Sequence, residues 1–80
     1  MKLAITGCNG QVGRRVVLLA LTRGHEVVGV DSVANKHDLP NGIIFHQIDL
    51  RDYDAALKAL EGCQAVIHLA GLFYMLIGMN

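Results

Sequence analysis

The hydrophobic positions along the chain follow two different periodicities. Four short apolar runs have the length and composition of buried strands, and they cover Lys2–Thr6, His25–Val30, Ile43–Ile48 and Ala65–Ala70. After the first run, apolar residues recur at helical spacing from Gln11 until Gly24, a residue suited to a left-handed helix exit. The pattern therefore predicts a strand, a turn and a helix of about three turns at the start of the chain.

A second helical pattern follows the third apolar run. Asp52 has the side chain of an N-cap, and Gly62 that of a helix stop. The connection between the second and third runs, residues 32–42, is polar with little apolar periodicity, so we expect a loop there.

Strands that alternate with helices predict an α/β fold with a parallel sheet. Right-handed crossovers favour a sheet of about four strands in the order 3-2-1-4, with flanking helices. The run Ala65–Ala70 has the composition of a strand covered on both faces, yet this order leaves it at an edge. The predicted sheet is therefore incomplete.

Length and charge restrict the classes of function. Eighty residues, of which 52% are hydrophobic, suffice for one small domain with a core. Seven basic residues balance seven acidic ones without any charged run, which argues against nucleic acid as a partner. No signal peptide precedes the first strand, so we expect a cytoplasmic protein.

The end of the chain and the two cysteines add little chemistry. Residues 72–80 form an apolar tail that is too short for a membrane span, and we interpret it as truncated or aberrant. Cys8 and Cys63 lack metal-ligand or redox-motif spacing, so we expect two reduced structural thiols and no metal site.

Three glycines form the first candidate site. Gly7, Gly10 and Gly13 have the spacing G-x-x-G-x-x-G between a predicted strand and a predicted helix. Glycines here allow a tight turn and close approach to a diphosphate, to which Gln11 and Val12 would donate backbone N–H groups. Turn glycines are often merely structural, but this context favours a nucleotide site.

Asp31 forms the second candidate site, eighteen residues beyond Gly13. Its carboxylate would accept hydrogen bonds from the adenosine ribose hydroxyls, and it would repel a 2′-phosphate. The expected cofactor is therefore NAD, with NADP less favoured, although Arg14 or Arg15 could reach a phosphate. Without the glycine turn, Asp31 would be interpreted as an ordinary loop acid.

Three segments together resemble a known family. They are Thr6-Gly7-Cys8-Asn9-Gly10-Gln11-Val12-Gly13, Asp49-Leu50-Arg51-Asp52 and His68-Leu69-Ala70-Gly71. They resemble the T-G-x-x-G-x-x-G, D-L-x-D and H-L-A-[AG] segments of the extended short-chain dehydrogenase/reductases, the NAD-dependent epimerase/dehydratase family. The resemblance implies that residues 1–71 are the N-terminal part of an NAD(P)-binding Rossmann domain.

The same resemblance implies further cofactor contacts. Asp49 and Leu50 would flank the adenine, while Leu69, Ala70 and Gly71 would lie beside the riboses. For Asp49, a purely structural role leading into the helix cap is an equal alternative. His68 lies in an apolar strand, where we expect a hydrogen-bonded core imidazole rather than a general base.

The family's reaction is hydride transfer at a carbonyl or alcohol carbon, and sugar nucleotides are among the implied substrates. Its catalytic Tyr-x-x-x-Lys pair has no counterpart here, because Leu57 follows Tyr53 and Gly78 follows Tyr74 at that spacing. No catalytic residue is assigned, and a small-molecule substrate is expected only for a full-length form. A non-catalytic dinucleotide-binding or redox-sensing module and an inactive fragment stay open, as does the oligomeric state.

Overall fold

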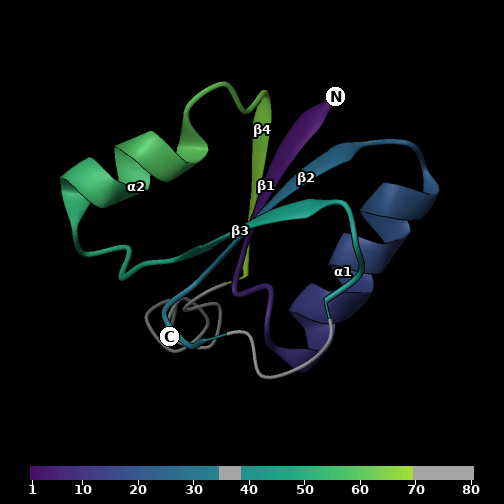
Figure 1. The fold of residues 1–80 in the computed structure, drawn as a ribbon, viewed down its shortest axis with the longest axis horizontal. Coiled ribbons are helices and arrows are strands. Elements are labelled where there is room, and N and C mark those ends of the chain that lie inside the picture. The colour runs from purple at the N-terminus through teal and green to yellow at the C-terminus, as the bar shows by residue number, and fades with distance from the viewer. Residues whose placement is uncertain (35–38, 70–80) are drawn as a thin grey trace, which may run out of the picture.

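The computed structural model of this chain describes residues 1–34 and 39–69. Strands and helices alternate along most of this length, with no helix in the described part of the connection between the second and third strands (Figure 1). The elements in chain order are β1 (Lys2–Thr6), α1 (Gln11–Thr22), β2 (Glu26–Asp31), β3 (Ile43–Gln47), α2 (Tyr53–Leu60) and β4 (Ala65–His68).

The four strands form one parallel sheet in the order β3-β2-β1-β4, as the sequence predicts. Its central pair, β1 and β2, is in register from Lys2 opposite Glu26 to Thr6 opposite Val30. One helix lies on each side of the sheet, α1 on one face and α2 on the other (Figure 1). The carboxyl ends of all four strands therefore meet at one rim.

The core on the α1 side is built from alternate residues of the central strands. Leu3, Ile5 and Val27 point to this face and pack with Val17 and Ala20, which are on the buried side of α1. This arrangement follows from a period of two in the strands and of 3.6 in the helix. It fixes α1 along β1 and β2, with its N-terminus at the rim.

The opposite face has a smaller core under α2. Ala4, Val28 and Val30 are buried there with Ala59. The cap predicted at Asp52 is confirmed, since its side chain accepts a hydrogen bond from the N–H of Ala55 at 3.2 Å.

The edge strand β4 departs from the expectation of a strand covered on both faces. Ala65, Val66 and His68 are exposed and only Ile67 is half-buried, because β4 has a neighbour on one side alone among the described strands and α2 lies over β2. The prediction that His68 is a core imidazole is therefore wrong, because its side chain is exposed. His68 is hydrogen-bonded, with its Nδ1 2.7 Å from Thr6 Oγ1, but it lies at the surface.

Neither described helix is long and apolar enough to cross a membrane.

The contact between Cys8 and Gly29 was not apparent from the sequence pattern. Cys8 is fully buried, and a Cβ added to Gly29 in the middle of β2 would lie 2.9 Å from its Sγ atom. The thiol thus occupies the space that a side chain at position 29 would need. Both cysteines are free, in agreement with the expectation of reduced thiols.

We predict that Gly29→Ala lowers the free energy of unfolding by about 1–3 kcal/mol, the usual cost of overpacking a core. Because the added methyl would meet the sulfur, the penalty should fall below about 1 kcal/mol when Cys8→Ala is also present. Denaturant unfolding of the two single variants and the double variant measures this coupling. An equal penalty in both backgrounds would contradict the assigned contact.

Burial and the nearby Asp31 charge raise the pKa of the Cys8 thiol to about 11. Because the thiolate is the reactive form, only a small fraction of Cys8 is reactive at pH 8, and this fraction should rise as the pH approaches and passes about 11. We predict that iodoacetamide labels half-buried Cys63 well before Cys8, as mass spectrometry of the native chain would show. Equal labelling rates of Cys8 and Cys63 in the native chain would contradict this prediction. The unfolded chain is the control, in which both thiols should react.

Candidate functional site

The connection from β1 to α1 folds back on itself at the sheet rim. Gly7 has a φ of +71° and donates its N–H to the carbonyl of Val30 at 2.8 Å, which joins the turn to β2. The N–H of Gly10 then donates to the carbonyl of Gly7 at 3.1 Å. These bonds pair the N–H groups of Gly7 and Gly10, and the start of α1 faces the rim.

The N-terminus of α1 has no internal partner for its first amides. Gly10 is the N-cap and provides no side-chain acceptor, and the first turn holds no acidic residue. Within the described residues, the N–H groups of Gln11, Val12 and Gly13 have no acceptor, whereas Arg14 bonds to Gly10. Free amides and the positive end of the helix dipole together attract an anion.

Gly13 sets how closely α1 approaches the turn. A Cβ at this position would lie 2.0 Å from the carbonyl oxygen of Gly7 and 2.8 Å from the Cα of Cys8. Both contacts are with backbone, so no side chain can be accommodated without moving the helix. The third glycine therefore holds the open amides against the end of β1.

Asp31 ends β2 and is bonded to the same turn. Its Oδ2 accepts the N–H of Asn9, and its Oδ1 accepts the N–H of Val33, each at 3.0 Å. The side chain is half-buried, and each carboxylate oxygen keeps a further lone pair for a hydroxyl donor. The structure thus brings together the glycine turn and Asp31, as the sequence predicts.

Asn9 is a site residue that the sequence reasoning passed over, because it occupies a variable position of the glycine pattern. Its Nδ2 donates to the carbonyl of Val33 at 2.8 Å, whereas its Oδ1 is buried and has no hydrogen-bond partner. An unpaired buried acceptor is costly unless a donor reaches it. A ligand that carries hydroxyl groups beside Asp31 could provide that donor, so this part of the site fits a nucleoside.

The segment after β3 lies beside Asp31, but the carboxylate of Asp49 in this segment is paired with Arg51. Ile48 donates its N–H to the carbonyl of Asp31 at 3.0 Å. The Asp49 carboxylate accepts hydrogen bonds from the Arg51 guanidinium, and this pairing lowers the pKa of Asp49 to about 2. Leu50 packs against the core under α2. The Asp49 carboxylate is thus paired with Arg51 at the surface.

The carboxyl end of β4 is joined to the end of β1. Leu69 donates its N–H to Thr6 Oγ1 at 3.0 Å and to the Thr6 carbonyl at 3.2 Å. This bond brings Leu69 to the rim beside the glycine turn. Ala70 and Gly71, the other two residues expected beside the riboses, lie outside the described residues, as does the tail 72–80.

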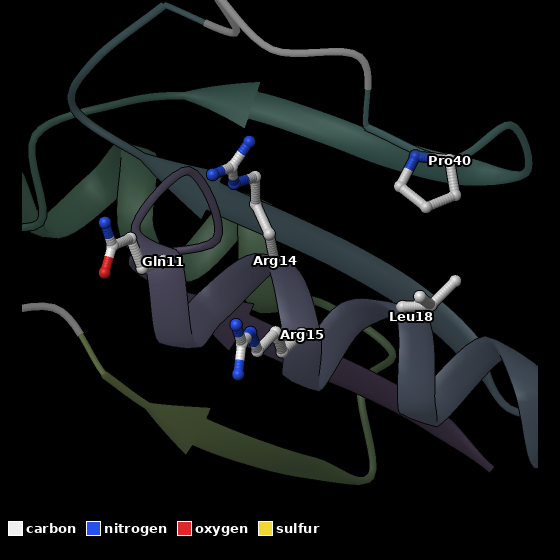
Figure 2. Close-up of a pocket in the computed structure, with 5 residues that line it drawn as sticks. All are labelled: Gln11, Arg14, Arg15, Leu18 and Pro40. Atoms are coloured by element: carbon white, nitrogen blue, oxygen red, sulfur yellow. The ribbon is translucent and has the colours of Figure 1, made fainter.

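A cavity of about 420 Å³ opens along the flank of α1 (Figure 2). Its lining residues are Gln11, Arg14, Arg15, Leu18 and Pro40. Across the described residues there is no cluster of three His, Cys, Asp or Glu side chains that could hold a metal ion.

Comparison with known proteins agrees with this geometry. Residues 3–75 match the family model described as the NAD dependent epimerase/dehydratase family. Short-chain dehydrogenase/reductase family 42E member 1 of Danio rerio is 39% identical over 66 residues, which are 82% of this chain and 17% of the relative.

Two solved structures share the fold. A short-chain dehydrogenase/reductase superfamily protein from Agrobacterium tumefaciens with bound NAD has a TM-score of 0.73 at 33% identity, over 86% of this chain and 20% of that one. The UDP-glucose 4-epimerase of Thermus thermophilus in complex with NAD has a TM-score of 0.74 at 32% identity, over 86% of this chain and 24% of that one.

The chain spans less than a quarter of the length of each of these three proteins. The family match nevertheless covers most of its residues, including the glycine turn, Asp31 and all four strands. The chain belongs to the NAD-dependent epimerase/dehydratase family, whose N-terminal Rossmann strands and helices it contains.

Proposed function

We propose that this chain binds NAD and forms the cofactor-binding part of an oxidoreductase or epimerase. The observation that carries the proposal is the unpaired N-terminus of α1, held against the glycine turn by Gly13, with Asp31 bonded to the same turn. The bound NAD of the two solved relatives, each above 30% identity, supports it.

The diphosphate and the two riboses of the cofactor have counterparts among the described residues. The diphosphate lies at the free amides of Gln11, Val12 and Gly13, where the helix dipole favours negative charge. The adenosine ribose lies at Asp31, whose fixed carboxylate accepts its two hydroxyls, and the unpaired Oδ1 of Asn9 lies in the same turn. Leu69 lies at the rim where the second ribose would pass.

The charge of Asp31 favours NAD over NADP. A 2′-phosphate carries about two negative charges at neutral pH, and placing it against an ionised carboxylate is unfavourable. The hydroxyl of NAD instead donates to that carboxylate. We therefore propose NAD as the preferred cofactor.

For the whole protein we propose hydride transfer at a carbonyl or alcohol carbon, with sugar nucleotides as one substrate class. Bound NAD supplies the hydride acceptor, and the residues described above bind and orient it. The likeness to a UDP-glucose 4-epimerase supports this substrate class.

A second candidate is a dinucleotide-binding module without turnover. Within these 80 residues, neither Tyr53 nor Tyr74 has a lysine four residues later. Such a lysine would lower the tyrosine pKa for proton transfer. We expect the 80-residue chain itself to bind the dinucleotide and to turn nothing over.

Gly13→Ala should weaken NAD binding about tenfold or more, because the methyl group pushes α1 away from the turn and misplaces its amides. Leu19→Ala is the control, since it truncates an exposed side chain on the same helix, away from the glycine turn. Calorimetric titration measures both, with circular dichroism to establish that each variant is folded. Equal affinities in the two folded variants would contradict the placement of the diphosphate.

Asp31→Asn should weaken NAD binding by roughly tenfold to a hundredfold, the value of a hydrogen bond to a charged group. The same change removes the repulsion of a 2′-phosphate, so the ratio of NAD to NADP affinity should fall. This shift in ratio separates a binding role from simple damage to the turn, which would weaken both ligands alike. Exposed Asp54→Asn is the control, and an unchanged ratio for Asp31→Asn would contradict the proposal.

A further inference from the structure

We propose that Asn41 is a site of spontaneous deamidation, whereas the second Asn-Gly pair of the chain, in the glycine turn, is protected by the fold. The two pairs are Asn9-Gly10 and Asn41-Gly42. Asparagine reacts readily in front of glycine, because glycine has no side chain to obstruct the attacking backbone nitrogen. A difference in rate between two pairs of the same sequence has to come from the structure around each of them. The inference does not depend on the proposed function.

The reaction is an internal displacement that uses only water as a co-reactant. The backbone nitrogen of the glycine attacks the side-chain carbonyl carbon of the asparagine, and the new C–N bond closes a succinimide ring. The bond from that carbon to Nδ2 breaks, and the nitrogen leaves as ammonia with the proton that the backbone nitrogen gives up. Water then opens the ring at either carbonyl carbon, which yields aspartate or isoaspartate.

Two kinds of hydrogen bond in a folded chain oppose this displacement. A bond donated by the glycine N–H holds the attacking nitrogen and the proton that it has to lose. A bond donated by the asparagine Nδ2 keeps the side-chain amide in one orientation. Each bond has to break before the ring can close, and its loss adds to the barrier.

The pair Asn41-Gly42 has neither restraint in the part of the chain that the structure describes. Both residues are exposed, and they form the turn directly before β3. No hydrogen bond within residues 1–34 and 39–69 involves the Asn41 side chain or the Gly42 N–H. Gly42 has a φ of +96°, and a Cβ at this position would have nothing within 4 Å. The turn is therefore open enough for the ring to form in the folded chain.

The pair Asn9-Gly10 has both restraints. The N–H of Gly10 donates to the carbonyl of Gly7 at 3.1 Å, and Nδ2 of Asn9 donates to the carbonyl of Val33 at 2.8 Å. The backbone N–H of Asn9 is also bonded, to Asp31 Oδ2 at 3.0 Å. The attacking nitrogen and the leaving nitrogen are thus both held, and ring closure requires the glycine turn to open first.

The two sites also differ in what deamidation would do to the molecule. Isoaspartate at position 41 adds a carbon to the main chain and a negative charge, but the ladder with β2 begins only at Ile43, opposite Val27. The sheet can therefore keep its pairing. At Asn9 the product would place a carboxylate oxygen where Nδ2 now donates to the Val33 carbonyl, so two acceptors would face each other. The hydrogen bonds that slow the reaction at Asn9 thus preserve the glycine turn.

The test is peptide mapping of the folded 80-residue chain after incubation at mildly alkaline pH. Trypsin separates the two pairs, because cleavage after lysine and arginine places Asn9 in peptide 3–14 and Asn41 in peptide 37–51. Mass spectrometry measures the mass increase that accompanies the loss of ammonia and the gain of water. We expect Asn41 to react at least about tenfold faster than Asn9, because opening the glycine turn costs free energy.

Two controls separate the effect of the fold from that of the sequence. In chain unfolded by urea both pairs lose their restraints, and their rates should come within about threefold of each other. Asn41→Gln should abolish the change in peptide 37–51, since glutamine has to close a larger ring, and should leave the rate in peptide 3–14 unchanged.

Two results would overturn the proposal. One is equal rates at the two pairs in the folded chain, which would mean that the hydrogen bonds of the glycine turn give no protection. The other is a folded chain whose peptide 37–51 stays unmodified over a time in which the unfolded chain reacts there, which would mean that the turn before β3 is closed to the reaction.

Discussion

The structure depends on the contact between the first turn of α1 and the end of β1. The Cα of Gly13 lies so close to the Gly7 carbonyl that the space for a Cβ is absent. That approach fixes the direction of α1 over β1 and β2 and leaves three amides facing the carboxyl rim of the sheet with no acceptor among the described residues. The buried side of α1, with Val17 and Ala20, packs on Leu3, Ile5 and Val27 and keeps the helix in this position. Core packing and the open helix end are thus two results of one backbone geometry.

Electrostatics at the rim follow from this arrangement. The start of α1 presents partial positive charge, its first turn holds no acidic residue, and Arg14 and Arg15 add two full charges on its flank. Asp31 supplies the one acid bonded to the glycine turn, where backbone donors hold both of its oxygens. An anionic diphosphate and a ribose would each meet groups of suitable charge. The proposed preference for NAD over NADP rests on the charge of Asp31.

Much of the fold could be predicted because it depends on local rules. Apolar runs fixed the strands, glycines and Asp52 marked the helix limits, and right-handed crossovers gave the strand order. The exposure of β4 was harder to judge, since its composition suits a covered strand while its position leaves it with one neighbour. The surface position of His68 follows from the same fact.

The partner of Asp49 is two residues away, yet a sequence pattern does not say whether a carboxylate faces a ligand or an arginine. The Cys8–Gly29 contact and the unpaired Asn9 and Arg14 atoms depend on tertiary packing, which a single sequence does not encode in any spacing.

The most direct test of the central claim is a titration of isotope-labelled chain with NAD, followed by the backbone amide resonances. If the open end of α1 binds the diphosphate, the amides of Gln11, Val12 and Gly13 should shift most, together with those that donate to Asp31, at Asn9 and Val33. Resonances near Gly24 and Gly62, which lie at the amino ends of the strands on the opposite rim of the sheet, should stay unchanged. If saturating NAD leaves the amide resonances of α1 unchanged, or shifts those of the opposite rim instead, the diphosphate does not bind at the start of α1.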